Sequence, residues 1–171
     1  MKKIFLIAAV ALLAAACEQK YDNWYSSAYK LSGEWVVKAD YYEASTSTWE
    51  AAAPYGIVIN TYSTAANVPT EIFIDDLSEG TRTFWNLKGK IKANAENATF
   101  GSATDTVVNL RYDSKFIVVD GQVLEGVGHS KTGVKTDSIV FVIRFDDDNP
   151  AWGTDYRISG HRKTGFTEDA Y

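Results

Sequence analysis

The sequence predicts an all-β fold in which about eight to ten short antiparallel strands form a barrel or a sandwich. Three observations support this prediction. From Gly33 onward apolar and polar residues alternate, and helical i, i+3, i+4 stripes are scarce. Turn sequences such as Ser78-Glu79-Gly80 and Asp147-Asp148-Asn149-Pro150 separate the apolar runs. Trp, Tyr and Phe make up 13% of the chain, which suits the interior of a barrel of about eight strands.

The first sixteen residues have the composition of an export signal. Lys2 and Lys3 precede an uninterrupted apolar run over residues 4–16, and Cys17 follows this run directly. The run is shorter than the roughly 20 residues that a bilayer-spanning helix needs. We therefore expect residues 1–16 to be a signal peptide that is removed during export.

The residues around the expected cleavage site resemble the lipobox of bacterial lipoproteins. Leu13-Ala14-Ala15-Ala16-Cys17 implies cleavage after Ala16 and lipidation of Cys17, although the usual branched aliphatic residue stands one place early, at Leu13. Cys17 is the only cysteine, so the chain cannot form an intramolecular disulfide and lipidation explains the residue best. The alternative is an ordinary secretory signal with a chance cysteine.

The expected lipoprotein has three parts: the signal peptide 1–16, a lipidated tether 17–32 and a single β-barrel domain 33–171. The tether is polar and rich in Ser and Tyr. Glu18 follows Cys17, where lipoproteins retained in the inner membrane of well-studied bacteria carry an aspartate. We therefore expect anchoring in the outer membrane, on a face that the sequence does not identify.

The charge of the mature chain excludes one class of partner. The leader contributes two lysines and no acids, so the mature chain would hold 15 basic and 22 acidic residues, a net charge of −7. Phosphate backbones are bound by basic surfaces, so we expect no nucleic-acid partner. An anionic membrane would repel such a domain, so the lipid itself must hold the protein there.

The expected strands follow one another at short spacing. In the first strand Trp35 and Val37 alternate with Glu34 and Lys38, which is typical of a strand with one dry face and one wet face. Asp120-Gly121 predicts a two-residue hairpin turn between its flanking strands. After the first strand, the expected strands are residues 56–62, 71–75, 83–93, 98–102, 107–112, 116–119, 122–130, 137–145 and 154–163.

The first and last strands together resemble lipocalin and calycin barrels. In those barrels a Gly-x-Trp opens the first strand, the Trp closes one end, and an Arg packs over its ring; here the motif is Gly33-Glu34-Trp35. The resemblance implies a cation–π contact of about 0.5 to 2 kcal/mol. Arg162 is the expected partner of the ring because it shares a strand face with Tyr156 and Ile158, and Arg157 on the other face is the second choice.

The C-terminal stretch Ile-Ser-Gly-His-Arg-Lys-Thr-Gly-Phe at residues 158–166 resembles a family of bacterial lipoproteins called lipid-binding putative hydrolases. That family is calycin-like, and the resemblance extends from about Leu31 to the end of the domain. It implies a calycin- or lipocalin-like antiparallel β-barrel and a lipid-like ligand.

The residues themselves offer little support for hydrolysis. Gly128-His129-Ser130-Lys131-Thr132 is the nearest match to G-x-S-x-G, but it ends in Thr and no helical pattern follows, so a nucleophile elbow cannot form. Ser27-Ala28-Tyr29-Lys30 matches S-x-x-K, but this serine lies in the tether and no S-D-N motif follows. We expect no catalytic residues, and the family name alone keeps a hydrolase as an alternative.

The two histidines occur in similar settings, Gly128-His129-Ser130-Lys131-Thr132-Gly133 and Gly160-His161-Arg162-Lys163-Thr164-Gly165. Either both segments mark strands that end in glycine turns, or two His-Lys pairs meet at one mouth of the barrel and bind an anionic head group. Two histidines without a third spaced ligand do not predict a zinc site, and the run Asp146-Asp147-Asp148 lacks the EF-hand pattern. We expect no metal or cofactor.

Two functions fit the predicted barrel. The first is binding of a small apolar or amphipathic ligand, and the alternative is a structural or interaction lipoprotein whose barrel is filled by its own side chains. In the second case exposed aromatic residues would meet a protein or glycan partner, and the candidates are Trp24, Tyr25, Tyr41 and Tyr42. The candidate lining residues of a ligand site, each of which could also be plain core, are Trp35, Val37, Trp85, Ile139, Phe141 and Tyr156, with Arg162 at the closed end.

Overall fold

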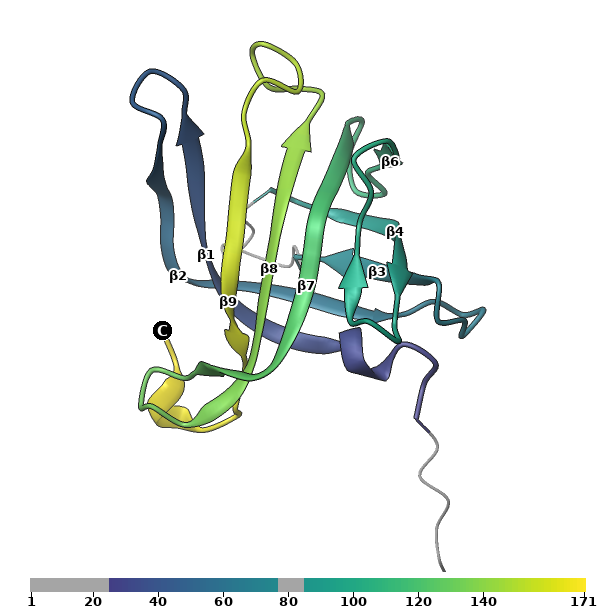
Figure 1. Cartoon of the computed structure of the whole chain (residues 1–171), viewed down its shortest axis with the longest axis vertical. Coiled ribbons are helices and arrows are strands. Elements are labelled where there is room, and N and C mark those ends of the chain that lie inside the picture. Colours follow the sequence, from purple (N-terminus) through teal and green to yellow (C-terminus); the bar gives the residue numbers. More distant parts are fainter. Residues whose placement is uncertain (1–24, 77–84) are drawn as a thin grey trace, which may run out of the picture.

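The computed structural model describes residues 25–76 and 85–171 (Figure 1). The expected signal peptide and Cys17 lie outside the described residues. Within the described ranges no helix is long and apolar enough to cross a bilayer. The elements are η1 (Tyr29–Leu31), β1 (Gly33–Glu43), β2 (Thr48–Ser63), β3 (Glu71–Asp75), β4 (Lys88–Asn94), β5 (Thr99–Phe100), β6 (Val107–Val108), β7 (Lys115–His129), β8 (Lys135–Phe145), β9 (Tyr156–Arg162) and η2 (Thr167–Asp169).

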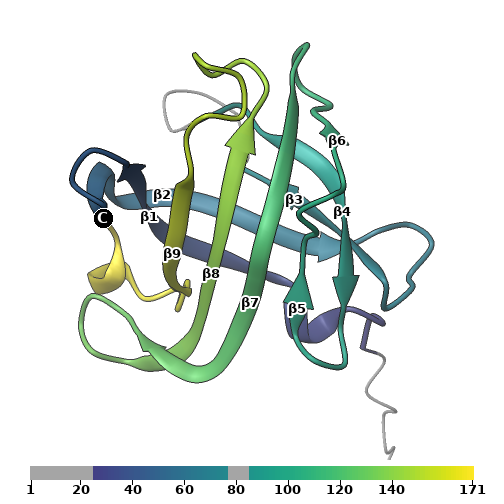
Figure 2. The ribbon, with the colours of Figure 1, turned by 45° about the horizontal axis from the view of Figure 1, so that its top comes forward.

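The strands form one antiparallel sheet that closes on itself. The order is β5-β4-β3-β2-β1-β9-β8-β7-β6, and an additional pairing of β5 with β7 completes a ring of eight strands. β6 pairs with β7 beside this ring. Figure 2 shows β1 and β2 running across behind β7, β8 and β9. The predicted all-β antiparallel fold is confirmed, with a barrel-like closed sheet.

Alternation along the strands directs apolar side chains into the ring. In β1 the side chains of Trp35, Val37 and Ala39 are fully buried, whereas Lys38 between them is half-buried on the outer face. β8 repeats the pattern with Ile139, Phe141 and Ile143. Burial of large apolar side chains contributes about 1.5 to 3 kcal/mol each, so these inward rows stabilise the closed ring.

The predicted hairpin at Asp120-Gly121 is wrong. β7 continues through this dipeptide as one strand, and its register against β8 shifts between Val119 and Gln122. Asp120 adopts a left-handed φ of 52°, which inserts an extra residue into the strand as a β-bulge does. The dipeptide therefore bends a strand instead of reversing it, and β7 stays paired with β8 on both sides of the bulge while its other edge pairs with β5.

Gly121 is required at this bulge because the chain approaches β5 closely. Gly121 pairs with Phe100, and a Cβ on Gly121 would lie 2.3 Å from the Phe100 ring. The contact between β5 and β7 is the one that closes the ring. Sequence patterns treat glycine after aspartate as a turn signal, but here it permits close packing of two strands.

Other strand boundaries also differ from those expected. β2 starts at Thr48, ahead of the expected start at residue 56, and β5 and β6 have only two residues each. Between β5 and β6 the chain leaves the sheet at Gly101, whose φ is 88°. Part of the expected strand 83–93 lies outside the described residues, and β4 begins at Lys88.

Residues that precede β1 also belong to the packed fold. Ala28 and Leu31 are fully buried, and Leu31 belongs to η1 at the start of the first strand. The hydroxyl of Thr61 on β2 donates to the carbonyl of Leu31. The residues just before the barrel therefore form part of its closed end.

Candidate functional site

The contact expected between Trp35 and Arg162 closes one end of the ring. The guanidinium carbon of Arg162 lies 4.4 Å from the centre of the Trp35 ring, and the indole N–H donates to the Thr61 hydroxyl at 2.8 Å. The second choice, Arg157, lies 4.5 Å over a different ring, that of Trp49 on the outer face. The sequence therefore identified the correct partner for Trp35.

Arg162 is held on three sides. Its Nη1 donates to the carbonyl of Ser32 at 2.6 Å, and its Nε donates to Asp137 at 3.0 Å. A Cβ at Gly33 would lie 2.3 Å from Nη1, so the glycine leaves the space that the guanidinium occupies. The Gly-x-Trp motif thus supplies both the ring and the room for the cation above it.

Most of the predicted lining residues belong to the packed core. Trp35, Val37, Ile139 and Phe141 are at most 1% exposed and lie in one hydrophobic cluster. Their burial matches the filled-barrel alternative, and direct contact of these side chains with a ligand stays a prediction.

The other two predicted residues lie together on a different part of the core. The ring of Trp85 lies 5.1 Å from that of Tyr156 and 4.9 Å from that of Phe145. The Tyr156 hydroxyl donates to Asp148 at 3.3 Å. Trp85 and Tyr156 are partly buried and form an aromatic cluster with Phe145.

A large cavity among the described residues is a groove on the outside of the ring. It has a volume of about 910 Å³ and lies between the outer faces of β3 and β4 and the segment 104–110. Phe73 on β3 lies in the groove, and Val107, Val108 and Leu110 supply apolar groups from the segment. We call this cavity the outer groove.

The outer groove exposes apolar side chains that the fold does not cover. Val108 is 61% exposed and Leu110 is 60% exposed. Val107 is partly buried, because Gly89 on β4 has no side chain and a Cβ there would lie 2.7 Å from Val107. The sequence thus brings the segment against β4 and leaves its next apolar residues accessible to a ligand.

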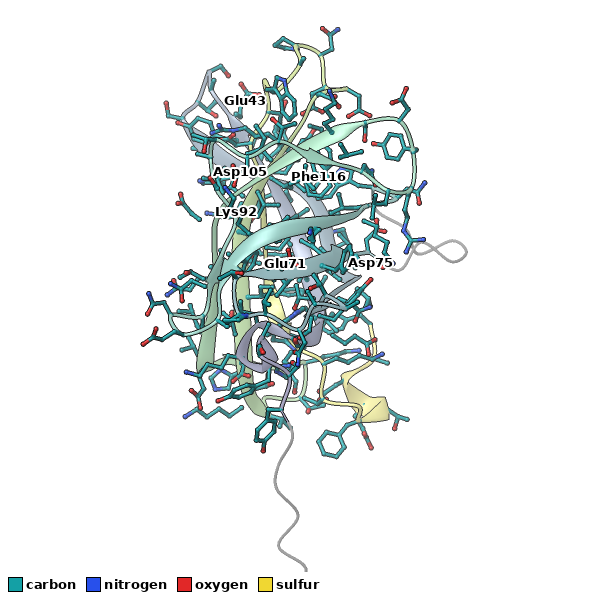
Figure 3. The ribbon with its side chains drawn as sticks, turned by 90° about the vertical axis from the view of Figure 1, so that its right-hand side faces the viewer. Glu43, Glu71, Asp75, Lys92, Asp105 and Phe116 are labelled. Carbon is teal, nitrogen blue, oxygen red and sulfur yellow. The ribbon has the colours of Figure 1, made fainter. Side chains whose placement is uncertain are left out.

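Two ion pairs line the same groove. Lys90 lies 2.9 Å from Glu71, and Lys92 lies 2.7 Å from Asp105. Figure 3 shows Lys92 next to Asp105, with Glu71 on the same side of the molecule. The Thr64 hydroxyl donates to Glu71 at 2.6 Å, and this bond together with Lys90 lowers the pKa of Glu71. The groove therefore combines apolar surface with fixed charges of both signs.

Backbone hydrogen bonds fix both ends of the segment that forms the groove wall. The Gly101 N–H donates to the Lys92 carbonyl at 2.8 Å, and the Leu110 N–H donates to the Lys88 carbonyl at 2.8 Å. Between these points the Lys88 N–H donates to Oδ1 of Asn109 at 3.1 Å, and Lys92 lies 2.7 Å from Asp105. The segment is thus attached to β4 along its length.

The outer groove is not predicted by the strand pattern of the sequence. Lys90 and Lys92 alternate with Gly89 and Ile91, which is typical of a strand with a solvated outer face. A signal was present in Val107-Val108-Asn109-Leu110, because successive strand residues point to opposite faces and Val107 and Val108 cannot both face the interior.

The two histidine motifs meet around the C-terminal segment. The N–H and hydroxyl of Thr132 donate to Oδ1 of Asp169 at 2.8 and 2.7 Å, and the Thr164 hydroxyl donates to Oδ2 at 2.5 Å. The bond from Thr164, then those from Thr132, hold the pKa of Asp169 far below its usual value. The Lys131 ammonium donates to the carbonyl of Ala170 at 2.7 Å. We call this set of contacts the C-terminal clasp.

The clasp decides between the two interpretations of the repeated motif. The two motifs do converge, but the anion that they bind is the protein's own Asp169. His161 is buried and its Nε2 lies 3.3 Å from the Tyr171 hydroxyl, whereas His129 is exposed. Ser130, the candidate nucleophile, accepts the N–H of Val134 at 3.1 Å. Both segments end strands in glycine turns, as the first interpretation held.

The aromatic residues considered for a partner differ in exposure. Tyr25 is 66% exposed and Tyr42 is 40% exposed, whereas Tyr41 is half-buried and donates to Glu50 at 2.8 Å. Trp24 lies outside the described residues. Among residues 25–76 and 85–171, no three His, Cys, Asp or Glu side chains are grouped so that they could hold a metal ion.

Comparison with known proteins bears on the family. No curated protein matches the chain significantly. A family model described as lipid-binding putative hydrolase matches residues 20–167, which is 148 of the 171 residues. The match spans every strand of the closed ring. The chain therefore belongs to the lipid-binding putative hydrolase family.

Proposed function

We propose that this protein is a membrane-anchored lipoprotein that binds a small amphipathic, lipid-like ligand in its outer groove. The observation that carries the proposal is the groove itself, a cavity of about 910 Å³ with uncovered apolar side chains and lysines along one side. Ligand pockets commonly measure about 300 to 1,000 Å³ and combine apolar walls with a few polar groups. The family description, lipid-binding, agrees with this chemistry.

The groove suits the two halves of an amphiphile. An alkyl chain against Phe73, Val108 and Leu110 would be removed from water, and each buried CH₂ is worth about 0.8 kcal/mol. The side chains of Lys90 and Lys92 are 55% and 73% exposed, so their ammonium groups can reach a polar head group. Because both lysines face carboxylates, an anionic head group competes with Glu71 and Asp105 for them.

The groove is favoured over the ring interior because a ligand inside the ring would have to displace packed side chains, whereas a ligand in the groove would not. The side chains facing inward are already in contact with one another, and Trp35 has its indole N–H bonded. A ligand there would have to separate packed core residues, and cavities of even a methyl group are costly in such cores. In the groove a ligand covers Val108 and Leu110, which water now contacts.

Anchoring forms the second part of the proposal. Cys17 would carry the lipid, in the outer membrane, and the net charge of −7 means that the domain itself is not attracted to anionic lipid. Multiple acyl chains on one residue give stable attachment, since a single chain binds only reversibly. The protein would then hold an amphipathic ligand close to the membrane from which such ligands come.

Titration of the mature chain with a fluorescent fatty acid tests the groove. Cys17→Ser gives the full chain without lipid, and into it we introduce Val108→Asp or Leu110→Asp at exposed groove positions. The control is Tyr42→Asp on β1, which is 40% exposed and lies outside the groove. We expect saturable binding that both groove variants weaken at least tenfold and the control leaves unchanged.

Two results would oppose the proposal. Absence of saturable binding, together with no co-purified lipid in native mass spectra of the host-derived protein, would reject lipid binding. Equal weakening by Tyr42→Asp and Val108→Asp would reject the groove as the site. Mass spectrometry of the mature N-terminus tests the anchor separately, because a lipidated Cys17 has a characteristic mass increase and an unmodified one does not.

A further inference from the structure

One end of the ring carries the start of the described chain. β1 begins there at Gly33, β9 ends there at Arg162, and the Thr136 hydroxyl on β8 bonds to the Arg162 carbonyl. The turn between β7 and β8, at residues 130–134, therefore lies at the same end. Figures 1 and 3 show η1 and η2 toward this end as well. We call it the tether end.

Exposed apolar side chains gather at the tether end. Phe166 is 59% exposed, Val134 is 39% exposed, and Val127 at the end of β7 is 59% exposed. Tyr25 and Tyr29 are 66% and 49% exposed, and their rings stack with centroids 4.9 Å apart. These five side chains come from three separate parts of the chain, and all three parts lie at the tether end without covering these side chains.

The structure holds these residues in place. The C-terminal clasp fixes the segment that contains Phe166, because Asp169 accepts three hydrogen bonds and its own N–H donates to the Phe166 carbonyl at 3.1 Å. Val134 is fixed by its N–H bond to Ser130. Phe166 and Val134 are therefore presented on an ordered surface.

The two ends of the ring differ in charge. The turn at the tether end, residues 130–134, contains Lys131 and no acid, and Lys135 follows it. The loop from β8 to β9 at the opposite end, residues 146–155, contains four aspartates and no lysine or arginine. The exposed Glu168 and the ion-paired Glu34 and Asp137 also lie at the tether end, so anionic lipid repels the acidic loop more strongly than the tether end, within a Debye length of about 8 Å at physiological salt.

The position of Cys17 limits how far the tether end can lie from the membrane. Tyr25 is the eighth residue after Cys17, and a fully extended chain spans at most about 3.6 Å per residue. Tyr25 is therefore within about 30 Å of a lipidated Cys17. This step rests on the anchoring that we proposed above.

From these observations we propose that the tether end is a membrane-docking face. Phe166, Val134, Val127 and the Tyr25–Tyr29 pair insert into the head-group region, and Lys131 and Lys135 face lipid phosphates. Aromatic side chains favour this region because one part of the ring is apolar and its edge or hydroxyl can stay hydrated. The ring then stands end-on, and the acidic loop 146–155 points away from the bilayer.

Docking also determines where the outer groove lies relative to the bilayer. The groove runs along β3 and β4 on the side of the ring, so end-on docking keeps it beside the bilayer rather than pressed against it. A ligand can then enter the groove without release of the docked end. The docking face and the groove are separate surfaces, and separate experiments test the two proposals.

Spin labels on the lipidated protein in vesicles of phosphatidylethanolamine and phosphatidylglycerol test the proposal. A lipidated Cys17 has no free thiol, so Val134→Cys or Ala151→Cys supplies the only labelling site. Ala151 is exposed in the acidic loop and is the matched control. We expect collisions with a water-soluble nickel complex to fall several-fold at position 134 and to stay at the solution value at position 151.

A second variant links the protection to the apolar groups. Phe166→Ser in the Val134→Cys background should restore much of the nickel collision rate at position 134, while fatty acid binding in the groove stays unchanged. Equal collision rates at positions 134 and 151 in vesicle-bound protein would reject docking and leave ligand binding untouched. Failure of the wild-type protein to float with vesicles would reject the anchor and the docking face together.

Discussion

The guanidinium of Arg162 lies 4.4 Å over the ring of Trp35, and this contact joins the last strand of the ring to the first. Trp35 is fully buried, and the two residues are also direct partners in the pairing of β1 with β9. The contact therefore seals the tether end of the core, beneath η1 and beside the proposed docking face.

Arg162→Gln should destabilise the fold. The variant loses the cation–π contact and weakens the charge-assisted bonds to Ser32 and Asp137, and we expect the free energy of unfolding to fall by about 1 to 3 kcal/mol. Arg157→Gln is the control, because Arg157 covers the less buried Trp49 and its partner Asp40 retains Lys38 at 3.2 Å. Urea unfolding measures both, and an equal or larger loss in Arg157→Gln would contradict the assignment.

Gly121→Ala should disrupt ring closure. The new methyl group would lie 2.3 Å from the Phe100 ring and 2.6 Å from its carbonyl oxygen, so β5 and β7 must separate. Overpacking of this kind costs about 1 to 3 kcal/mol. Gly133→Ala is the contrast, because it adds only backbone strain at a φ of 87° and meets no atom within 4 Å. Amide exchange at Gln122 and Thr99 should accelerate in Gly121→Ala and not in Gly133→Ala.

Asp169→Asn should loosen the C-terminal clasp. The carboxylate has a pKa far below its usual value, so its contribution is present at pH values above about 4 and is lost as pH falls toward the lowered pKa. The amide removes that charge at every pH. We expect faster hydrogen exchange at the Thr132 N–H in the variant at pH 7, whereas Glu168→Gln, on an exposed neighbour, should leave it unchanged.

Asp76→Asn should stabilise the protein near neutral pH. Asp76 is 3% exposed, and burial raises its pKa although the N–H groups of Trp85 and Leu87 oppose the shift. A raised carboxyl pKa means that wild-type stability falls as pH rises through that pKa. The variant should therefore be more stable than the wild type at pH 7 and differ little from it at pH 4.

Substitution of the neighbouring carboxylate, Asp75, should have the opposite effect on stability. Asp75 faces Arg111 at 2.5 Å and Lys88 at 3.1 Å, so Asp75→Asn removes the charge that both cations face. We expect this variant to lose stability at pH 7, since breaking one partner of a buried pair is strongly destabilising. A gain in Asp75→Asn, or a loss in Asp76→Asn, in chemical denaturation at pH 7 would contradict the account.

The sequence predicted the architecture well because alternation is a local signal. Trp35 and Val37 show which face of β1 is dry, and the same rule gave the inward rows of β8. Closure depends on contacts between distant residues, such as Gly121 with Phe100, and no local pattern distinguishes that bulge from a hairpin. Left-handed backbone at Asp120 suits a bulge as well as a hairpin turn. The dipeptide therefore predicted the local backbone conformation correctly, but not the path of the chain.

The candidate site was harder to predict. Trp35 and Arg162 were found because a motif specifies both residues, whereas the outer groove depends on where the segment 104–110 crosses β3 and β4. Lys90 and Lys92 look like ordinary outer-face residues until that segment lies beside them. The paired histidine motifs were visible in the sequence, but their shared partner, Asp169, follows from the path of the last residues.

Methyl NMR with a bound fatty acid tests the central claim most directly. Titration of oleate into the non-lipidated mature chain should shift the methyl signals of Val107, Val108 and Leu110 and leave those of the interior residues Val37 and Ile139 nearly unchanged. Saturable shifts confined to these groove methyls are the result that we predict. Shifts that centre on Val37 and Ile139, with the groove methyls silent, would place the ligand inside the ring and contradict the account.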